Sequence, residues 1–295
     1  MNNTNIMKIN NLRVDYGNFT ALYINTPIEF LAGDRIGIIG SNGAGKSTFA
    51  KALSGLVNYQ GDIQTKLTKA DIGIHLQSNG YVKRMSVRLI IETICNTKIK
   101  DNKRLQEIIK FFDFEECLKK KFAQLSGGQQ QKMTIILVLL HDTKLTLFDE
   151  VTSGLDFEAR AKLTDRICDW YAKSDSTVCF VSHYYDELEK LVNKLLIIES
   201  GNVVDFGDVR ELFKKYCGNV VYVIANTVSN IEATKDFNSI GAPKHLLAFT
   251  CSKEAEENKL AQVLTANNIN FKRSNKDIEI LFVNAVKSFR ERGEI

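Results

Sequence analysis

The segment GSNGAGKST, residues 40–48, constrains the fold of this chain more than any other stretch. It matches the pattern G-x-x-x-x-G-K-[ST], in which a glycine-rich loop joins a strand to a helix and surrounds a phosphate with backbone N–H groups. The apolar run Arg35–Ile39 before it is typical of a buried strand. After it, apolar side chains recur at helical spacing from Ser47 onward, at Phe49, Ala52, Leu53 and Leu56. The sequence therefore predicts a phosphate-binding loop between a buried strand and a helix.

The residue types in this loop suit a polyphosphate. Glycine at Gly43 and Gly45 lets the backbone curl without a Cβ atom that would block the phosphate oxygens. Lys46 offers a positive charge to the terminal phosphates, and the Ser47 hydroxyl can ligate Mg²⁺. We expect the whole loop to contact the nucleotide, that is Gly40, Ser41, Asn42, Gly43, Ala44, Gly45, Lys46, Ser47 and Thr48.

Two later motifs narrow the chemistry. LSGGQ stands at Leu125–Gln129, and the apolar strand-like run LTLFDE, Leu145–Glu150, ends in two carboxylates. Of these, Asp149 can hold a Mg²⁺ ion, while Glu150 can orient and deprotonate the attacking water. Together with the phosphate loop, this pair predicts metal-assisted phosphoryl transfer.

Short strand-like stretches alternate with helical periodicity along most of the chain, which is the pattern of an α/β domain. Further strands are expected at Leu145–Phe148 and Thr177–Val181, and the pair Gly201-Asn202 is expected to turn a hairpin. Residues 82–122 have helical periodicity and few strand formers. They predict a helical insertion between the two nucleotide motifs.

The pattern restarts after Gly218. The stretches VVYVIA and HLLAFTCS predict strands, Lys253–Asn267 predicts a polar helix, and ILFVNAV is a final apolar segment. We therefore expect a nucleotide-binding domain over residues 1–218, with a helical subdomain at about 82–140, and a small α+β accessory or regulatory domain over residues 219–295.

Composition excludes several other classes of protein. A chain of 295 residues with 44% hydrophobic and 25% charged residues is not mainly disordered. The longest apolar run, Ile135–Leu140, falls far short of the roughly 20 residues that cross a bilayer, and the N-terminus lacks a secretory signal, so we expect the chain in the cytosol. The six cysteines contain no CxxC pair, which argues against a zinc site, a redox motif or a disulfide framework.

Charge is modest overall and uneven along the chain. The formal net charge of +4 does not indicate a nucleic-acid partner. Between Lys83 and Lys121, however, eleven Lys or Arg stand against six Asp or Glu. This excess is typical of a solvated helical face, and it also suits a surface near anionic lipid headgroups.

The phosphate loop, LSGGQ and LTLFDE together resemble the motifs of the ATP-binding-cassette (ABC) ATPase family, over roughly residues 6–215. The resemblance implies a P-loop NTPase cassette with a β-rich N-terminal subdomain and a helical insertion, which binds ATP and Mg²⁺ and hydrolyses ATP. It implies that Tyr16 stacks on the adenine and that Gln77 contacts both Mg²⁺ and the attacking water. It also implies that His183 touches the γ-phosphate and steadies Glu150.

In this family the LSGGQ segment of one subunit completes the ATP site of the other. The resemblance therefore implies a dimer with a second copy or a paralogous ATPase subunit. It assigns Ser126, Gly127, Gly128 and Gln129 to the ATP site of the opposite subunit, and Asp156 of the segment SGLD to the nucleotide-binding loop that couples the two sites.

The simplest interpretation is a transporter subunit at the cytoplasmic face of the cell membrane, which energises a separate transmembrane permease. The C-terminal extension resembles the small domain that follows the cassette in bacterial exporters of drugs, peptides and antibiotics, and this implies export. An alternative is a soluble ABC ATPase that remodels a scaffold, as in iron-sulfur cluster assembly. A nucleotide sensor without turnover is disfavoured because both carboxylates and His183 are present.

Overall fold

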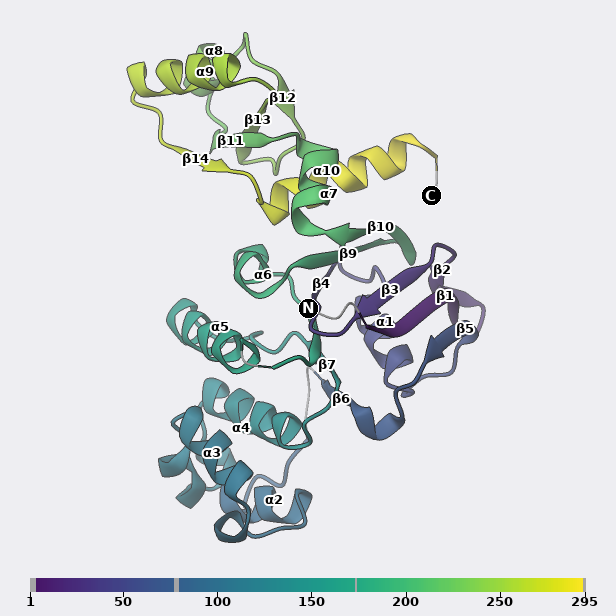
Figure 1. The fold of residues 1–295 in the computed structure, drawn as a ribbon. Helices are drawn as coiled ribbons and strands as arrows, with labels where there is room; N and C mark the ends of the chain where they lie inside the picture. Colours follow the sequence, from purple (N-terminus) through teal and green to yellow (C-terminus); the bar gives the residue numbers. More distant parts are fainter. Residues whose placement is uncertain (1–3, 77–79, 173, 294–295) are drawn as a thin grey trace.

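The computed structural model describes residues 4–76, 80–172 and 174–293. A large sheet with its helices lies in the middle of the molecule (Figure 1). A helical part lies at one end, and a small α+β unit lies at the other, with helices α7 and α10 between that unit and the large sheet. The phosphate loop and the run Leu145–Glu150 belong to this sheet.

The large sheet has the strand order β3-β1-β2-β10-β9-β4-β8-β7-β6, and β5 pairs with β1. Strands β4, β6, β7, β8 and β9 run parallel to their neighbours within this group, whereas β1, β2, β3 and β5 form an antiparallel part. The bounds are β1 Asn5–Tyr16, β2 Phe19–Ile24, β3 Ile28–Leu31, β4 Arg35–Ile39, β5 Gln60–Thr65, β6 Ile72–His75, β7 Leu145–Asp149, β8 Thr177–Val181, β9 Lys194–Glu199 and β10 Asn202–Asp208.

Side-chain patterns explain which strands lie where. Strands β4, β7 and β8 are almost continuously apolar, and all their residues except Arg35 are buried, as in parallel strands covered on both faces. Strand β1 instead alternates, with Met7 and Ile9 buried and Lys8 between them partly exposed, because only one of its faces meets the core.

Strands of the parallel group are followed by the helices α1 (Lys46–Leu53), α5 (Phe157–Tyr171) and α6 (Tyr185–Leu191). The predicted helix after the phosphate loop is present, and Phe49 is fully buried. One part of that prediction was wrong: the helix ends before Leu56, whose side chain is 54% exposed. The chain leaves the helix at Ser54 and turns at Gly55, which has a φ of 71°, so the helical spacing no longer applies at Leu56.

The helical part comprises α2, Val87–Ile94, α3, Lys103–Phe111, and α4, Gly127–Leu140. Short 3₁₀ helices at Ile99–Asp101, Glu115–Lys119 and Phe122–Gln124 connect them, and another at Lys69–Asp71 precedes β6. Phe112 and Phe114 are fully buried at the centre of this part. The segment predicted to be helical, residues 82–122, is therefore mostly helical, and its buried apolar side chains belong to one cluster with residues of the large sheet such as Phe148.

After α7, Val209–Cys217, a second sheet has the strand order β12-β13-β11-β14. Its elements follow one another as β-α-β-β-α-β, the ferredoxin-like arrangement, and a final helix is added. The bounds are β11 Val220–Ala225, α8 Val228–Ala233, β12 Ser239–Ile240, β13 Leu246–Cys251, α9 Glu254–Ala266, β14 Phe271–Ser274 and α10 Ile278–Glu291. The sequence predicted β11, β13 and α9, and the final apolar segment lies within α10.

Helix α10 joins the second sheet to the rest of the molecule. Its buried side chains, including Leu281 and Phe289, belong to one apolar cluster with Phe213 of α7, Leu188 of α6 and Val221 of β11. On the other face of the second sheet, Tyr222 and Phe249 form a separate small cluster with α9. The outer layers of this unit thus have their own core, whereas its inner face shares the core of the main sheet.

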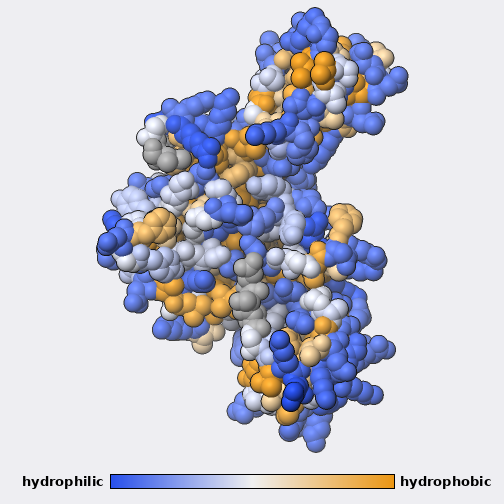
Figure 2. All heavy atoms as spheres, turned by 180° about the vertical axis from the view of Figure 1, so that it is seen from behind, coloured by the Kyte–Doolittle hydropathy of each residue, from blue (hydrophilic) through white to orange (hydrophobic). Residues whose placement is uncertain are grey.

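Hydrophilic side chains predominate on the face of the molecule shown in Figure 2, with smaller hydrophobic areas on the C-terminal unit and on the helical part. Within the described residues, none of the helices combines the length and the apolar character needed to cross a membrane.

Candidate active site

The parallel strands bring three predicted motifs to one edge of the large sheet. The phosphate loop follows β4, His183 follows β8, and Glu150 follows β7. Strand β8 lies between the other two, and Val181 is in register with both Ile38 and Asp149. Since the carboxyl ends of neighbouring parallel strands meet at the same edge, the three motifs converge there.

The phosphate loop starts where the backbone of β4 passes very close to β9. A Cβ atom added to Gly40 would lie 2.1 Å from the backbone oxygen of Ile198, so only glycine fits. At Gly43 a Cβ atom would meet no atom within 4 Å, although its φ of 79° is one that favours glycine. The loop is therefore tightly held at its first residue and open at its tip.

Lys46 lies beneath the loop and is 6% exposed. Its Nζ donates hydrogen bonds to the carbonyl oxygens of Gly40 and Ser41, each at 2.9 Å. Burial lowers the pKa of Lys46, and the negative charges of Glu150, Asp149 and Glu199 act in the opposite direction. A buried ammonium group held by carbonyl oxygens can turn toward an anion that enters the loop.

Asp149 and Ser47 lie side by side at the foot of the loop. The Ser47 hydroxyl donates to Asp149 Oδ1 at 3.1 Å. Burial raises the pKa of Asp149, and the hydrogen bond from Ser47 opposes this shift. A hydroxyl and a carboxylate oxygen at this position fit Mg²⁺, which prefers oxygen ligands and takes the remainder from phosphates and water. Gln77, the third predicted Mg²⁺ ligand, lies outside the described residues.

Glu150 has an unusual backbone and a defined partner. Its φ is 50°, which a residue with a Cβ atom seldom adopts, and its N–H donates to the carbonyl of Val181 at 2.9 Å. The Nε2 atom of His183 lies 2.9 Å from Glu150 Oε1. Such backbone strain costs about 1–3 kcal/mol and tends to persist at functional sites, where it fixes the direction of a side chain.

Most of the predicted residues line one cavity of about 380 Å³, although Gly40, Ser41 and Asp149 are not part of its lining. The predicted members are Tyr16, Asn42, Gly43, Ala44, Gly45, Lys46, Ser47, Thr48, Glu150 and His183. Phe19 also lines it and is 63% exposed, although none of the sequence motifs includes it. Phe19 is paired with Tyr16 across the turn between β1 and β2, and recognition of that hairpin would have indicated it.

The LSGGQ residues lie elsewhere. Ser126 caps the N-terminus of α4, where its Oγ accepts from the Gln129 N–H at 3.3 Å, and Gln129 Oε1 accepts from the Ser126 N–H at 3.2 Å. A second cavity of about 320 Å³ is lined by Ser126, Gly128, Gln129 and Asp156, among others. Within the described part of the chain, the residues lining this cavity and those lining the loop cavity do not overlap. One chain thus presents two separate sets of the predicted residues.

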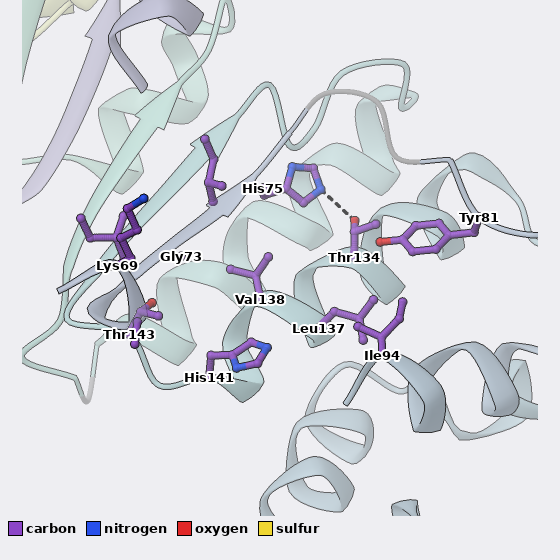
Figure 3. A pocket seen from close by; sticks show the side chains of 13 residues that line it. Lys69, Gly73, His75, Tyr81, Ile94, Thr134, Leu137, Val138, His141 and Thr143 are labelled. Atoms are coloured by element: carbon purple, nitrogen blue, oxygen red, sulfur yellow. Dashed lines mark hydrogen bonds between the residues drawn. The ribbon is translucent and has the colours of Figure 1, made fainter. Parts of the chain in front are cut away.

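A third cavity, of about 370 Å³, lies between the edge strand β6 and helix α4. Figure 3 shows His75 of β6 pointing toward Thr134 of α4, with His75 Nε2 and Thr134 Oγ1 2.7 Å apart. Burial lowers the pKa of His75 to about 4, so its ring is neutral at pH 7. Apolar side chains, among them Ile94 and Leu137, line the rest.

The chain resembles known proteins in sequence and in fold. The sequence profile described as "ABC transporter" matches residues 25–153. The chain is 31% identical over 205 residues to the tungstate uptake system ATP-binding protein TupC of Peptoclostridium acidaminophilum, a match that covers 66% of this chain and 95% of TupC. It is 28% identical over 226 residues to the methionine import ATP-binding protein MetN of Clostridioides difficile, covering 70% of each.

A solved structure shows the same fold. The structure of cbiO1 from Clostridium perfringens, described as part of the ABC transporter complex cbiONQ, superposes with a TM-score of 0.63. Its sequence is 23% identical, and the match covers 72% of this chain and 91% of that one. The predicted P-loop NTPase cassette fold is confirmed.

Fold and site together define a P-loop ATPase. The chain belongs to the ABC transporter family, as an ATP-binding subunit that hydrolyses ATP. The expected resemblance to exporters was wrong, because the relatives named above are uptake and import proteins. The short apolar motifs of the C-terminal extension were too general to indicate a direction of transport.

The close contact at Gly40 gives a prediction. Gly40→Ala would force the loop and β9 apart, so we expect a loss of about 3 kcal/mol in the free energy of unfolding. Gly43→Ala, in open space, should cost about 1 kcal/mol through its backbone conformation alone. Urea unfolding of both variants measures the difference. Equal losses would show that the contact between Gly40 and Ile198 does not constrain the loop.

Proposed function

We propose that this chain is the ATP-hydrolysing subunit of a transporter in which two such subunits enclose ATP and drive a separate transmembrane permease at the cytoplasmic face of the cell membrane. The observation that carries the proposal is the pair Glu150–His183, 2.9 Å apart, on the same cavity as Lys46. A proton acceptor, its orienting partner and a cation for phosphate thus face one space.

The phosphate tail is bound by the loop. Its N–H groups and the N-terminus of α1 attract the anion, and the ammonium of Lys46 exchanges the carbonyl oxygens of Gly40 and Ser41 for phosphate oxygens. Tyr16, at the mouth of the cavity, stacks on the adenine, which contributes on the order of 1–3 kcal/mol where aromatic side chains stack on bases.

Ser47 and Asp149, with Gln77 as the sequence predicts, would hold Mg²⁺, which supplies charge neutralisation at the phosphate oxygens when bound. The carboxylate of Glu150 accepts the proton of the attacking water. His183 Nε2, beside Glu150 Oε1, keeps that carboxylate directed at the cavity and contacts the γ-phosphate. The positive φ of Glu150 serves the same end, because it fixes the direction in which the side chain leaves β7.

The second set of residues acts on the opposite subunit. Ser126 lies at the N-terminus of α4, where helix N–H groups and the positive end of the helix dipole attract an anion. We assign the γ-phosphate of the partner's ATP to Ser126, Gly127, Gly128 and Gln129, and coupling across the interface to Asp156. The partner is a second copy or a paralogous ATPase subunit, since one chain carries the two sets on separate cavities.

The cavity between β6 and α4 is the place proposed for a cytoplasmic segment of the permease. It opens beside the helical part, and one of its lining residues, His75, stands two positions before Gln77 in the sequence. Its lining combines apolar side chains such as Ile94 and Leu137 with the tyrosine Tyr81 (Figure 3). This is the composition that accepts an apolar anchor from a partner protein.

The assignment of Glu150 is tested by Glu150→Gln. The amide cannot accept the proton of water, so we expect turnover to fall at least about 100-fold while ATP binding persists. Glu107→Gln, an exposed carboxylate on α3, is the matched control and should hydrolyse ATP at the parental rate. Phosphate release under multiple-turnover conditions measures both. Parental turnover in Glu150→Gln would refute its role as general base.

The permease site is tested on α2, where two apolar side chains of similar exposure differ in position. Ile94 lines the cavity between β6 and α4 and is 48% exposed, whereas Leu89 is 46% exposed and is not part of its lining. We expect Ile94→Asp to weaken co-purification with the permease at least about tenfold, because binding of the permease would remove the new carboxylate from water. Leu89→Asp should have little effect, and both should keep the ATPase rate of the isolated subunit. Equal retention of the permease by the two variants would contradict this placement.

A further inference from the structure

A buried carboxylate lies between the phosphate loop and the C-terminal helix. Glu199 is the last residue of β9 and is 3% exposed. Its Oε2 accepts a hydrogen bond from the Ser41 hydroxyl at 2.7 Å. Its Oε1 accepts from the guanidinium of Arg290, which lies on α10. The second residue of the phosphate loop is therefore two hydrogen bonds away from the C-terminal unit.

The charge of Glu199 needs both partners. A carboxylate removed from water costs several kcal/mol unless a cation and hydrogen-bond donors compensate it. Ser41 supplies a neutral donor, and Arg290 supplies the positive charge. The negative charge of Glu199 also acts on Lys46 of the same loop. Without Arg290, Glu199 would still have two groups of the loop to compensate it, the Ser41 hydroxyl and the charge of Lys46.

The same helix holds the segment after His183. The rings of Phe282 on α10 and Tyr185 on α6 are stacked, with centroids 5.8 Å apart and an angle of 29° between planes. Tyr185 stands two residues after His183. Further along α6, Glu189 accepts the N–H of Ile278 at 3.4 Å and lies 3.5 Å from Lys272 Nζ. The C-terminal unit thus contacts both segments that carry nucleotide-site residues.

We propose that Arg290 is a positioning residue of the ATP site, which acts through Glu199 to fix Ser41 and the phosphate loop. The inference rests on the proposed function, because it assigns to the C-terminal unit the task of setting the affinity of that site for ATP. When α10 is seated, Arg290 neutralises Glu199 and leaves Lys46 free to bind phosphate. When α10 moves away, Glu199 competes with ATP for Lys46, so the placement of the C-terminal unit regulates nucleotide binding in the same chain.

The proposal predicts a change in affinity with little change in the catalytic step. Arg290→Met should weaken ATP binding and raise KM for ATP about tenfold, the effect expected when a charge-assisted hydrogen bond to a buried group is lost. The kcat at saturating ATP should stay within about twofold, since Glu150 and His183 are not touched by Arg290. A loss of folded protein alone would lower the apparent kcat and leave KM unchanged.

Three further proteins complete the experiment. Arg290→Lys keeps the charge and should recover most of the affinity. Lys287→Met also removes a cation from α10, but the Nζ atom of Lys287 lies 4.0 Å from Glu291 on the same helix. This variant should bind ATP as the parent does. In the double variant Arg290→Met, Glu199→Gln the uncompensated charge is absent, so ATP affinity should exceed that of Arg290→Met alone.

The measurements are titration calorimetry with ATP and steady-state hydrolysis by the full chain. Parental ATP affinity in Arg290→Met, with normal hydrolysis by the parent, would overturn this inference and leave the proposed function standing. Failure of the parental chain to bind ATP would instead overturn the proposed function together with the inference. Equal loss of affinity in Arg290→Met and Arg290→Lys would show that charge compensation of Glu199 is not the mechanism.

Discussion

The buried ammonium of Lys46 is the constraint on which the rest of the site depends. The carbonyl oxygens of Gly40 and Ser41 hold it, and the negative charges of Asp149, Glu150 and Glu199 act on it, where the strands β4, β7 and β9 end. A buried cation is stable there only because these strands deliver oxygens to it from several directions. The same arrangement leaves the charge available when a polyphosphate offers stronger acceptors.

In the proposed assembly, one chain holds only part of an ATP site. The loop cavity contains the groups for phosphate and water, whereas Ser126 and Asp156 line another cavity on the helical side. Closure of two subunits would join these parts, and the cavity between β6 and α4 offers a way to pass that movement to a membrane partner. At the opposite end, α10 contacts the site through Glu199 and Tyr185, so the nucleotide can be influenced from both ends of the molecule.

Sequence patterns predicted the parts of the site that depend on contiguous residues. The loop, β4, β7 with its two acidic residues, and His183 after β8 all lie where their motifs indicated, because local spacing determines the strand-loop-helix geometry. Phe19, Glu199 and Arg290 escaped prediction because their roles arise from pairing between distant segments. Leu56 was misplaced because a turn at Gly55 interrupts the helical spacing. The strands β12 and β14 are too short or too polar to show the strand pattern.

The central claim is that ATP bound at Lys46 of one subunit is completed by Ser126 of another. Sedimentation velocity of the Glu150→Gln protein, with and without ATP and Mg²⁺, tests it most directly, because trapped nucleotide should hold the subunits together. We predict monomers without ATP and dimers with ATP, and loss of the dimer when Ser126→Arg is added although ATP still binds. A protein that stays monomeric with saturating ATP, or a dimer that persists in Ser126→Arg, would contradict the account.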